Sequence, residues 1–150
     1  MYSVNDLNNI NDEIQPLKEL ADRELKSIYG LSGEVYTPHI DAYNVVALRK
    51  AKILFSLKSN GVIPFSEVES ISAKLMILYR KTKNCEVVEL DGNNYVCHFS
   101  PLKLSKTGKV VRKWAKYFLK QTADGQTDKE WEEQVREIWP ENFVIRNDDF

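Results

Sequence analysis

Apolar residues recur at steps of three and four in three stretches of the first half of the chain, which is the spacing of one helix face. The first stretch covers residues 4–29 and contains Pro16, which predicts either a kink or the start of a second helix. The second covers residues 42–59 and is apolar around much of its circumference, which predicts burial near the centre of the fold. The third opens at Ser66, whose spacing to Glu69 is that of a capping box.

Residues 84–100 change to a period of two, the period of a β-strand. The sequence NCEVVELDGNNYVCHFS predicts an antiparallel hairpin turning at DGNN, with Leu90 opposite Tyr95. This register places Cys85 and Cys97 on opposite faces, so no disulfide between them is expected. It also gathers one apolar face, formed by Val88, Leu90, Tyr95, Cys97 and Phe99.

Two more helices are predicted in the last third of the chain. In residues 106–120, KTGKVVRKWAKYFLK, basic residues recur at helical steps, and the opposite side carries Val111, Trp114, Ala115 and Phe118. Thr107 is expected to cap this basic helix. Thr127 or Asp128 is expected to cap the last helix, DKEWEEQVREIW, and Pro140 to end it.

The order of helices, hairpin and helices predicts the α+β class. We expect a helix-dominated single domain over residues 1–150, with one antiparallel β-hairpin at about residues 84–100. Residues 31–41 are expected to form a loop around a short strand, and Pro101 to end the hairpin. The C-terminal end is expected to hold a short strand at 143–145 and a flexible acidic tail at 146–150.

The composition is that of a globular protein, with 43% hydrophobic and 29% charged residues. No apolar run approaches the roughly 18 residues that cross a bilayer, and the polar first twenty residues lack the pattern of a secretory signal. An intracellular, cytoplasmic protein that does not bind membranes is therefore expected. Two cysteines are too few for a disulfide framework.

Charge is distributed unevenly along the chain. Residues 103–120 contain seven Lys or Arg and no acidic residue, whereas residues 121–150 contain nine Asp or Glu. Such a basic surface suits nucleic acid, an acidic partner protein, or the acidic last helix of the same chain, and the sequence leaves these three open. The candidate basic face consists of Lys106, Lys109, Arg112, Lys113, Lys116 and Lys120.

Aromatic residues concentrate in the same third of the chain. Tryptophan often anchors protein interfaces, so Trp114, Trp131 and Trp139 are candidate partner anchors, although all three can equally belong to the core. The terminal sequence NDDF is similar to the tails that single-stranded-DNA-binding proteins of bacteria and phages present to their partners. That resemblance makes Phe150 a fourth candidate anchor.

Catalytic signatures are weak in this sequence. His98 lies in YVCHFS, a pattern that resembles one of the two His-x-Ser/Thr strands of two-histidine phosphoesterases. The second histidine, His39, lies in PHID, where Asp41 replaces the hydroxyl residue. A phosphodiesterase would need both imidazoles to converge as general acid and base. The two His and two Cys lack the spacing of a metal site, and no cofactor-binding motif is found, so no metal and no cofactor are expected.

These observations predict a non-catalytic intracellular binding protein rather than an enzyme. A protein-protein interaction module, such as an inhibitor, adaptor or immunity-type protein, is the first hypothesis. A nucleic-acid-binding accessory protein that uses the basic helix 107–120 is the alternative, and a phosphodiesterase with His39 and His98 is the remote one. Small chains of this kind are common among accessory proteins of phages and mobile elements. The sequence does not specify the oligomeric state.

Overall fold

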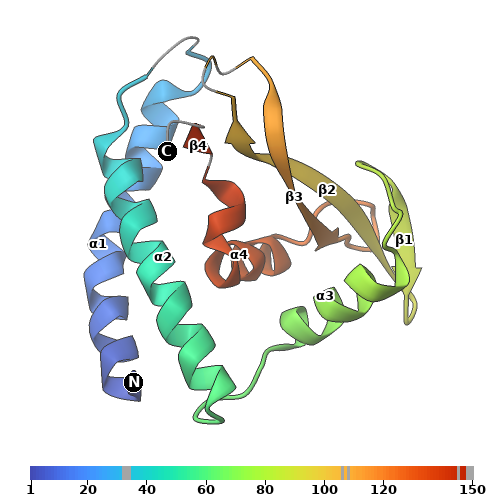
Figure 1. Ribbon diagram of the computed structural model, residues 1–150, viewed down its shortest axis with the longest axis horizontal. Coiled ribbons are helices and arrows are strands. Elements are labelled where there is room, and N and C mark those ends of the chain that lie inside the picture. Colours follow the sequence, from blue (N-terminus) through green and yellow to red (C-terminus); the bar gives the residue numbers. More distant parts are fainter. Residues whose placement is uncertain (32–34, 106, 108, 145, 148–150) are drawn as a thin grey trace. The chain divides into compact units, whose positions relative to one another are not determined.

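The computed structural model describes residues 1–31, 35–105, 107, 109–144 and 146–147 (Figure 1). They group into two compact units, residues 1–64 and residues 65–150, called here the N-terminal and C-terminal units. The first is helical, and the second combines helices with an antiparallel sheet. The predicted α+β class is thereby confirmed. That the two units form one globular domain stays a prediction.

The N-terminal unit is a pair of helices, α1 (Val4–Ile28) and α2 (Pro38–Ser59). Ser3 and Asp6 form a capping box at the start of α1, and the helix continues through Pro16 as one element. The two helices bury a small core of Ile10, Val46, Ile53 and Leu57. The predicted helix over 4–29 is therefore confirmed.

The start of α2 corrects the expectation for residues 31–41, because residues 38–41 are helical. Pro38 occupies the first turn, where its fixed φ suits a helix and its missing N–H costs nothing. The burial expected for this helix near the centre of the fold is not seen within the N-terminal unit. The helix packs on α1 by one side, and Val45 and Phe55 remain 64% and 69% exposed.

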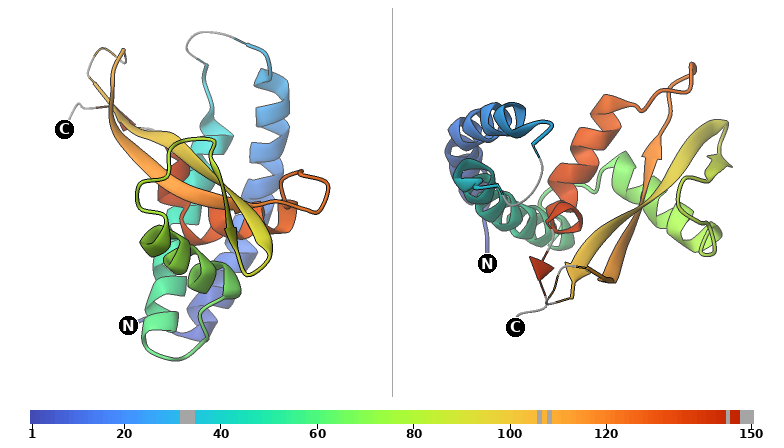
Figure 2. Two further views of the ribbon diagram at one scale, coloured as in Figure 1. Left: turned by 90° about the vertical axis from the view of Figure 1, so that its right-hand side faces the viewer. Right: turned by 90° about the horizontal axis from the view of Figure 1, so that it is seen from above.

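The C-terminal unit begins with α3 (Glu67–Leu78), whose predicted capping box between Ser66 and Glu69 is present. Three strands of its sheet, β1 (Val87–Leu90), β2 (Asn93–Leu104) and β3 (Val111–Lys120), lie in this order and pair antiparallel (Figure 2). The chain then forms α4 (Lys129–Ile138), capped by Asp128, one of the two predicted caps, and a 3-10 turn, η1 (Pro140–Phe143).

The C-terminal end corrects the expected tail. A short strand, β4 (Arg146–Asn147), pairs in parallel with β2 at Lys103 and Leu104. Two residues of the expected flexible segment thus belong to the sheet. The strand expected at 143–145 is not seen at Phe143 and Val144, and Ile145 and residues 148–150 lie outside the described residues.

The predicted hairpin is confirmed, with a correction to its register. Asp91 and Gly92 form a two-residue turn with φ of 51° and 82°, the positive values that a type I′ turn requires. Val88 therefore lies opposite Tyr95, two residues from the predicted alignment. A shift of two keeps every side chain on its face. The predicted apolar face holds, with Tyr95 and Cys97 buried in the core of the unit.

The predicted basic helix is wrong, because residues 111–120 form the strand β3. Valine, tryptophan, tyrosine and phenylalanine are strong strand formers, and β2 offers a complete ladder from Tyr95 to Pro101. Side chains of a strand alternate, so the basic residues do not share one face. Within the described residues, no basic helix faces the acidic α4 either.

The core of the C-terminal unit lies between the sheet and its helices. Val68 and Leu75 of α3 pack on the face that carries Tyr95 and Phe118. On the other face, the ring of Tyr117 lies 5.0 Å from that of Phe143. Trp131 and Val135 of α4 are buried in the same cluster. The C-terminal half of β3 is thus packed against α3, α4 and η1.

Candidate binding site

The outer edge of β3 is the first part of the candidate site. The hydrogen bond from Gln121 N to Asn94 O fixes the alternation of the β2–β3 ladder. Main-chain groups of even-numbered residues from 114 to 120 therefore point away from β2. Two of their carbonyls are used, since Phe118 O accepts from Trp131 Nε1 at 3.2 Å and Lys120 O accepts from Asp128 N at 2.9 Å.

Trp114 and Lys116 lie on the same edge as Phe118 and Lys120, but in the described residues their outward main-chain groups are not used in this way. Within the part of the chain that the structure describes, no hydrogen bond reaches the outward N–H or C=O of either residue. Exposed N–H and C=O groups of this kind are a template on which another strand can pair. The edge of β3 is therefore open over its middle portion.

The ladder is irregular next to this open edge. Trp114 lies opposite Pro101, and Lys113 opposite Lys103, so that Leu102 and then Arg112 are bulged out of register. Pro101 occupies a pair that exchanges no hydrogen bonds, so its missing N–H costs nothing there. The strand β2 consequently continues to Leu104, which corrects the expectation that Pro101 ends it.

The residues of the candidate basic face have different surroundings, because most of them belong to the strand β3 rather than to a helix. Lys109, Arg112 and Lys113 are exposed near the loop between β2 and β3, and Lys106 lies outside the described residues. Lys116 instead donates to the carbonyls of Tyr79 and Arg80, and the ammonium of Lys120 lies 5.8 Å from the ring centroid of Trp131. Among the described members of this basic face, Lys109 and Lys113 are therefore the lysines that are exposed to a partner.

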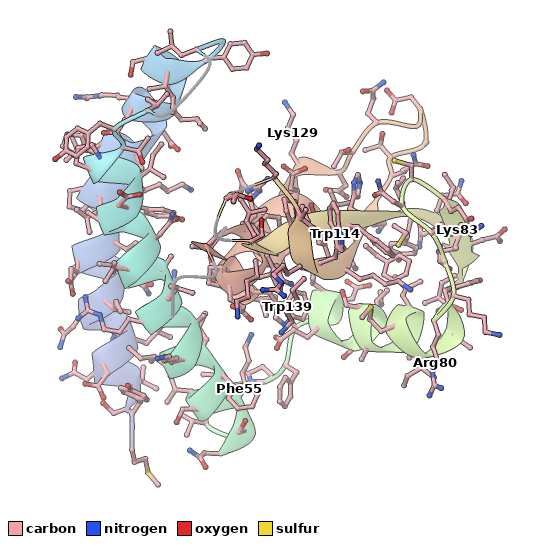
Figure 3. The ribbon with its side chains drawn as sticks, turned by 45° about the horizontal axis from the view of Figure 1, so that its top comes forward. Phe55, Arg80, Lys83, Trp114, Lys129 and Trp139 are labelled. Carbon is pink, nitrogen blue, oxygen red and sulfur yellow. The ribbon has the colours of Figure 1, made fainter. Side chains whose placement is uncertain are left out.

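The candidate anchors are divided in the same way. Trp114 on β3 is 53% exposed (Figure 3). Trp131 is buried in the core, where its ring contacts Tyr95. Trp139 is half-buried at the end of α4, and Phe150 is outside the described residues. Trp114 is thus the predicted anchor that the structure leaves at the surface.

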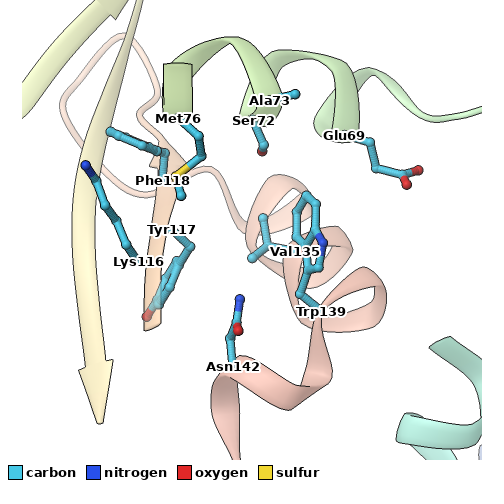
Figure 4. A pocket seen from close by; sticks show the side chains of 10 residues that line it. All are labelled: Glu69, Ser72, Ala73, Met76, Lys116, Tyr117, Phe118, Val135, Trp139 and Asn142. Atoms are coloured by element: carbon cyan, nitrogen blue, oxygen red, sulfur yellow. The ribbon is translucent and has the colours of Figure 1, made fainter. Parts of the chain in front are cut away.

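A pocket of about 260 Å³ adjoins the open edge (Figure 4). The strand β3 contributes Lys116, Tyr117 and Phe118 to its wall, beside Val135 and Trp139 of α4. Burial raises the pKa of the Tyr117 hydroxyl, which Arg136 opposes more weakly. The remaining lining residues come from α3 and η1, and they are Glu69, Ser72, Ala73, Met76 and Asn142.

Sequence reasoning missed this pocket, although one signal was present. Glu69, Ser72, Ala73 and Met76 recur at steps of three and four, which is a second face of α3 beside its core stripe. Ser72 and Ala73 are small, and small side chains on a helix face leave room beside it. Nothing in the sequence indicated that β3 and α4 close the other sides.

The two histidines belong to different units. His39 lies in the first turn of α2, and His98 lies on β2, so neither compact unit contains both imidazoles. The His98 ring stacks on Tyr117 with centroids 5.5 Å apart and planes inclined by 18°. Burial lowers the pKa of His98, against a smaller opposing effect of Glu132. His98 is therefore a side chain packed on one face of the sheet.

The described ranges show neither a candidate metal site nor a candidate membrane span. They contain no group of three or more His, Cys, Asp and Glu side chains that could hold a metal ion. Nor does any helix among them have the length and apolar character to cross a membrane. Comparison of the chain with protein-family models, with curated proteins and with solved structures gave no match.

Proposed function

We propose that this chain is a non-catalytic, intracellular protein-binding module that meets its partner at the β3 edge. One observation carries the proposal, namely that Trp114 is 53% exposed on an edge whose main-chain groups are open. An exposed indole on a fixed strand offers a large contact area at a low cost in side-chain entropy. The adjoining pocket adds a concave apolar surface beside it.

The test compares the proteins that bind the purified chain and its Trp114→Ala variant in cell extract. Specific partners should be captured by the wild type and lost with Trp114→Ala. Tyr36→Ala is the matched control, because Tyr36 is 85% exposed in the N-terminal unit. Partners that bind both variants as well as they bind the wild type would contradict the proposal.

Nucleic acid is the second candidate partner. Lys109 and Lys113 are exposed near Trp114, and residues 103–120 contain no acidic residue. Exposed cations and an exposed indole on one strand are two components of surfaces that bind single-stranded nucleic acid, and here Lys113 and Trp114 project from opposite faces of β3. Anisotropy of labelled single- and double-stranded DNA and RNA at about 50 mM and then about 200 mM salt tests it.

Salt dependence decides between the two candidates. Release of counterions from phosphate contacts should weaken binding of nucleic acid by orders of magnitude between these concentrations. Lys113→Glu combined with Lys109→Glu should abolish it. Absence of binding at the lower salt concentration would remove nucleic acid and leave the protein-binding proposal. Lys116 is unsuitable for this test because its ammonium has a structural role.

A further inference from the structure

We propose that the partner segment is an extended acidic peptide that adds as a strand to β3 and places one apolar side chain in the adjoining pocket. This inference rests on the proposed protein-binding function and names the mode and the chemistry of the contact. Strand addition obtains its affinity from main-chain hydrogen bonds and its specificity from pockets for single side chains. The β3 edge and the pocket supply these two components.

The open edge of β3 presents the main-chain donors and acceptors that an added strand needs. The N–H and C=O groups of Trp114 and Lys116 point outward, and so does the N–H of Phe118. The opposite edge of the sheet is less suitable. There β1 has four residues, and the outward carbonyl of Glu89 already accepts from the Tyr79 hydroxyl at 2.5 Å.

The pocket has the size of a site for one side chain. Its volume of about 260 Å³ lies below the roughly 300–1,000 Å³ of typical small-molecule sites. Met76, Val135 and Trp139 give it apolar walls. Lys116 lies both on the open edge and in the pocket wall, so a peptide paired at Lys116 reaches the pocket without a gap.

Charge complementarity selects an acidic peptide. Lys109 and Lys113 are exposed at the end of the edge remote from the pocket, and Lys113 lies opposite Lys103. At the other end, Glu69 lines the pocket. Acidic side chains are therefore favoured near Lys113 and disfavoured near Glu69. The peptide should carry its apolar residue at one end and its acidic residues at the other.

The test uses fluorescein-labelled synthetic peptides, in which one phenylalanine precedes or follows a run of alternating valine and aspartate. Fluorescence anisotropy should show binding of one of these orders, and a peptide with lysine in place of aspartate should not bind. N-methylation of every second peptide amide gives two peptides, one methylated at odd and one at even positions. A strand pairs with β3 through every second residue, so one of these two phases of methylation should reduce affinity about tenfold and the other should reduce it little.

Two pairs of variants separate the edge from the pocket. Trp114→Pro removes the outward N–H and should lose about tenfold more affinity than Trp114→Ala. The substitution breaks no hydrogen bond of the sheet, because Trp114 and Pro101 exchange none. Ala73→Phe should fill the pocket and abolish the preference for phenylalanine. Ser70→Phe, on an exposed position of the same helix, should preserve it. Circular dichroism establishes that each variant folds.

The possible failures are distinct. If Trp114→Ala loses partners from cell extract but none of the peptides binds the wild type, strand addition is wrong and protein binding stands. If the peptides bind with equal sensitivity to both phases of N-methylation, the contact is electrostatic and the inference is overturned. If neither partners nor peptides bind, both the strand-addition inference and the proposed function are wrong.

Discussion

The ammonium of Lys116 donates a hydrogen bond of 2.7 Å to the main-chain carbonyl of Tyr79, the residue that ends α3. A second bond of 2.9 Å reaches the carbonyl of Arg80. The last turn of α3 contains no basic residue of its own. A cation on the neighbouring strand therefore lies at the negative end of the helix dipole, where it donates to the carbonyls of the C-cap residue and of the residue after it.

Lys116→Met should lower the free energy of unfolding of the C-terminal unit by about 1–2 kcal/mol, because it keeps the apolar stem and removes the charged donor. All three tryptophans lie in this unit, so denaturant unfolding followed by tryptophan fluorescence measures its stability. Lys113→Met is the control, since Lys113 is exposed opposite another lysine and should change stability little. An equal loss in both variants would contradict the capping role.

The same lysine explains why the sequence misled about residues 106–120. Basic residues at 109, 112, 113, 116 and 120 fit helical steps, but three of them have separate surroundings in the strand. Lys116 caps a helix, Lys120 lies over Trp131, and Arg112 is at a bulge. Local periodicity cannot reveal these tertiary partners. Short amphipathic segments of this kind are ambiguous, and β2 decides the outcome by offering its edge.

The N-terminus of α2 is capped by a side chain from α1. The carboxylate of Glu24 accepts from His39 N at 3.1 Å and from Ile40 N at 3.2 Å, whereas Thr37 at the N-cap makes no such bond. Glu24→Ala should leave both donors unsatisfied and destabilise the helix pair by about 1 kcal/mol. Amide hydrogen exchange at Ile40 should accelerate correspondingly.

Glu19→Ala is the matched control for that change, because Glu19 is exposed on the same helix. Exchange at Ile40 should remain at its wild-type rate in that variant. Protection that survives Glu24→Ala would show that water or the adjoining backbone caps α2 equally well. This contact also explains why α2 begins before its apolar pattern, since Glu24 supports a turn that the pattern does not reach.

The two thiols should differ in reactivity. Cys85 is exposed, whereas Cys97 is buried and burial raises the pKa of its thiol. Because the thiolate is the reactive form, an alkylating reagent should modify Cys85 in the folded protein and Cys97 after denaturation. Mass spectrometry of the native and unfolded protein measures both, with Cys85→Ser as the control. Modification of native Cys97 at the rate of Cys85 would contradict its burial.

The sequence identified the elements that carry their own signals. The capping box of Ser66 and Glu69 was found, Asp128 was one of two caps expected before α4, and the hairpin was located although its turn was expected over four residues instead of two. The candidate site was predicted only in part, since Trp114 was named as a candidate anchor while the open edge and the pocket beside it were not predicted. An edge and a pocket arise from long-range packing, and the residues that form them are distant in sequence.

His98 should make the stability of the C-terminal unit depend on pH. Burial lowers the pKa of His98 below its ordinary value of 6.5, so the unfolded chain binds a proton at a higher pH than the folded one. The stability contributed by the neutral ring is present above about pH 6.5 and is lost as the pH falls through the folded pKa. Among charged neighbours, Glu132 opposes this shift.

His98→Phe removes the titrating group and keeps an aromatic ring against Tyr117. The free energy of unfolding, measured by tryptophan fluorescence between about pH 7 and about pH 5, should fall less in this variant than in the wild type. His39→Phe lies in the other unit and should retain the wild-type dependence. Equal slopes for the wild type and His98→Phe would assign the pH dependence to carboxylates, and burial of the neutral imidazole would then have no measurable effect on stability.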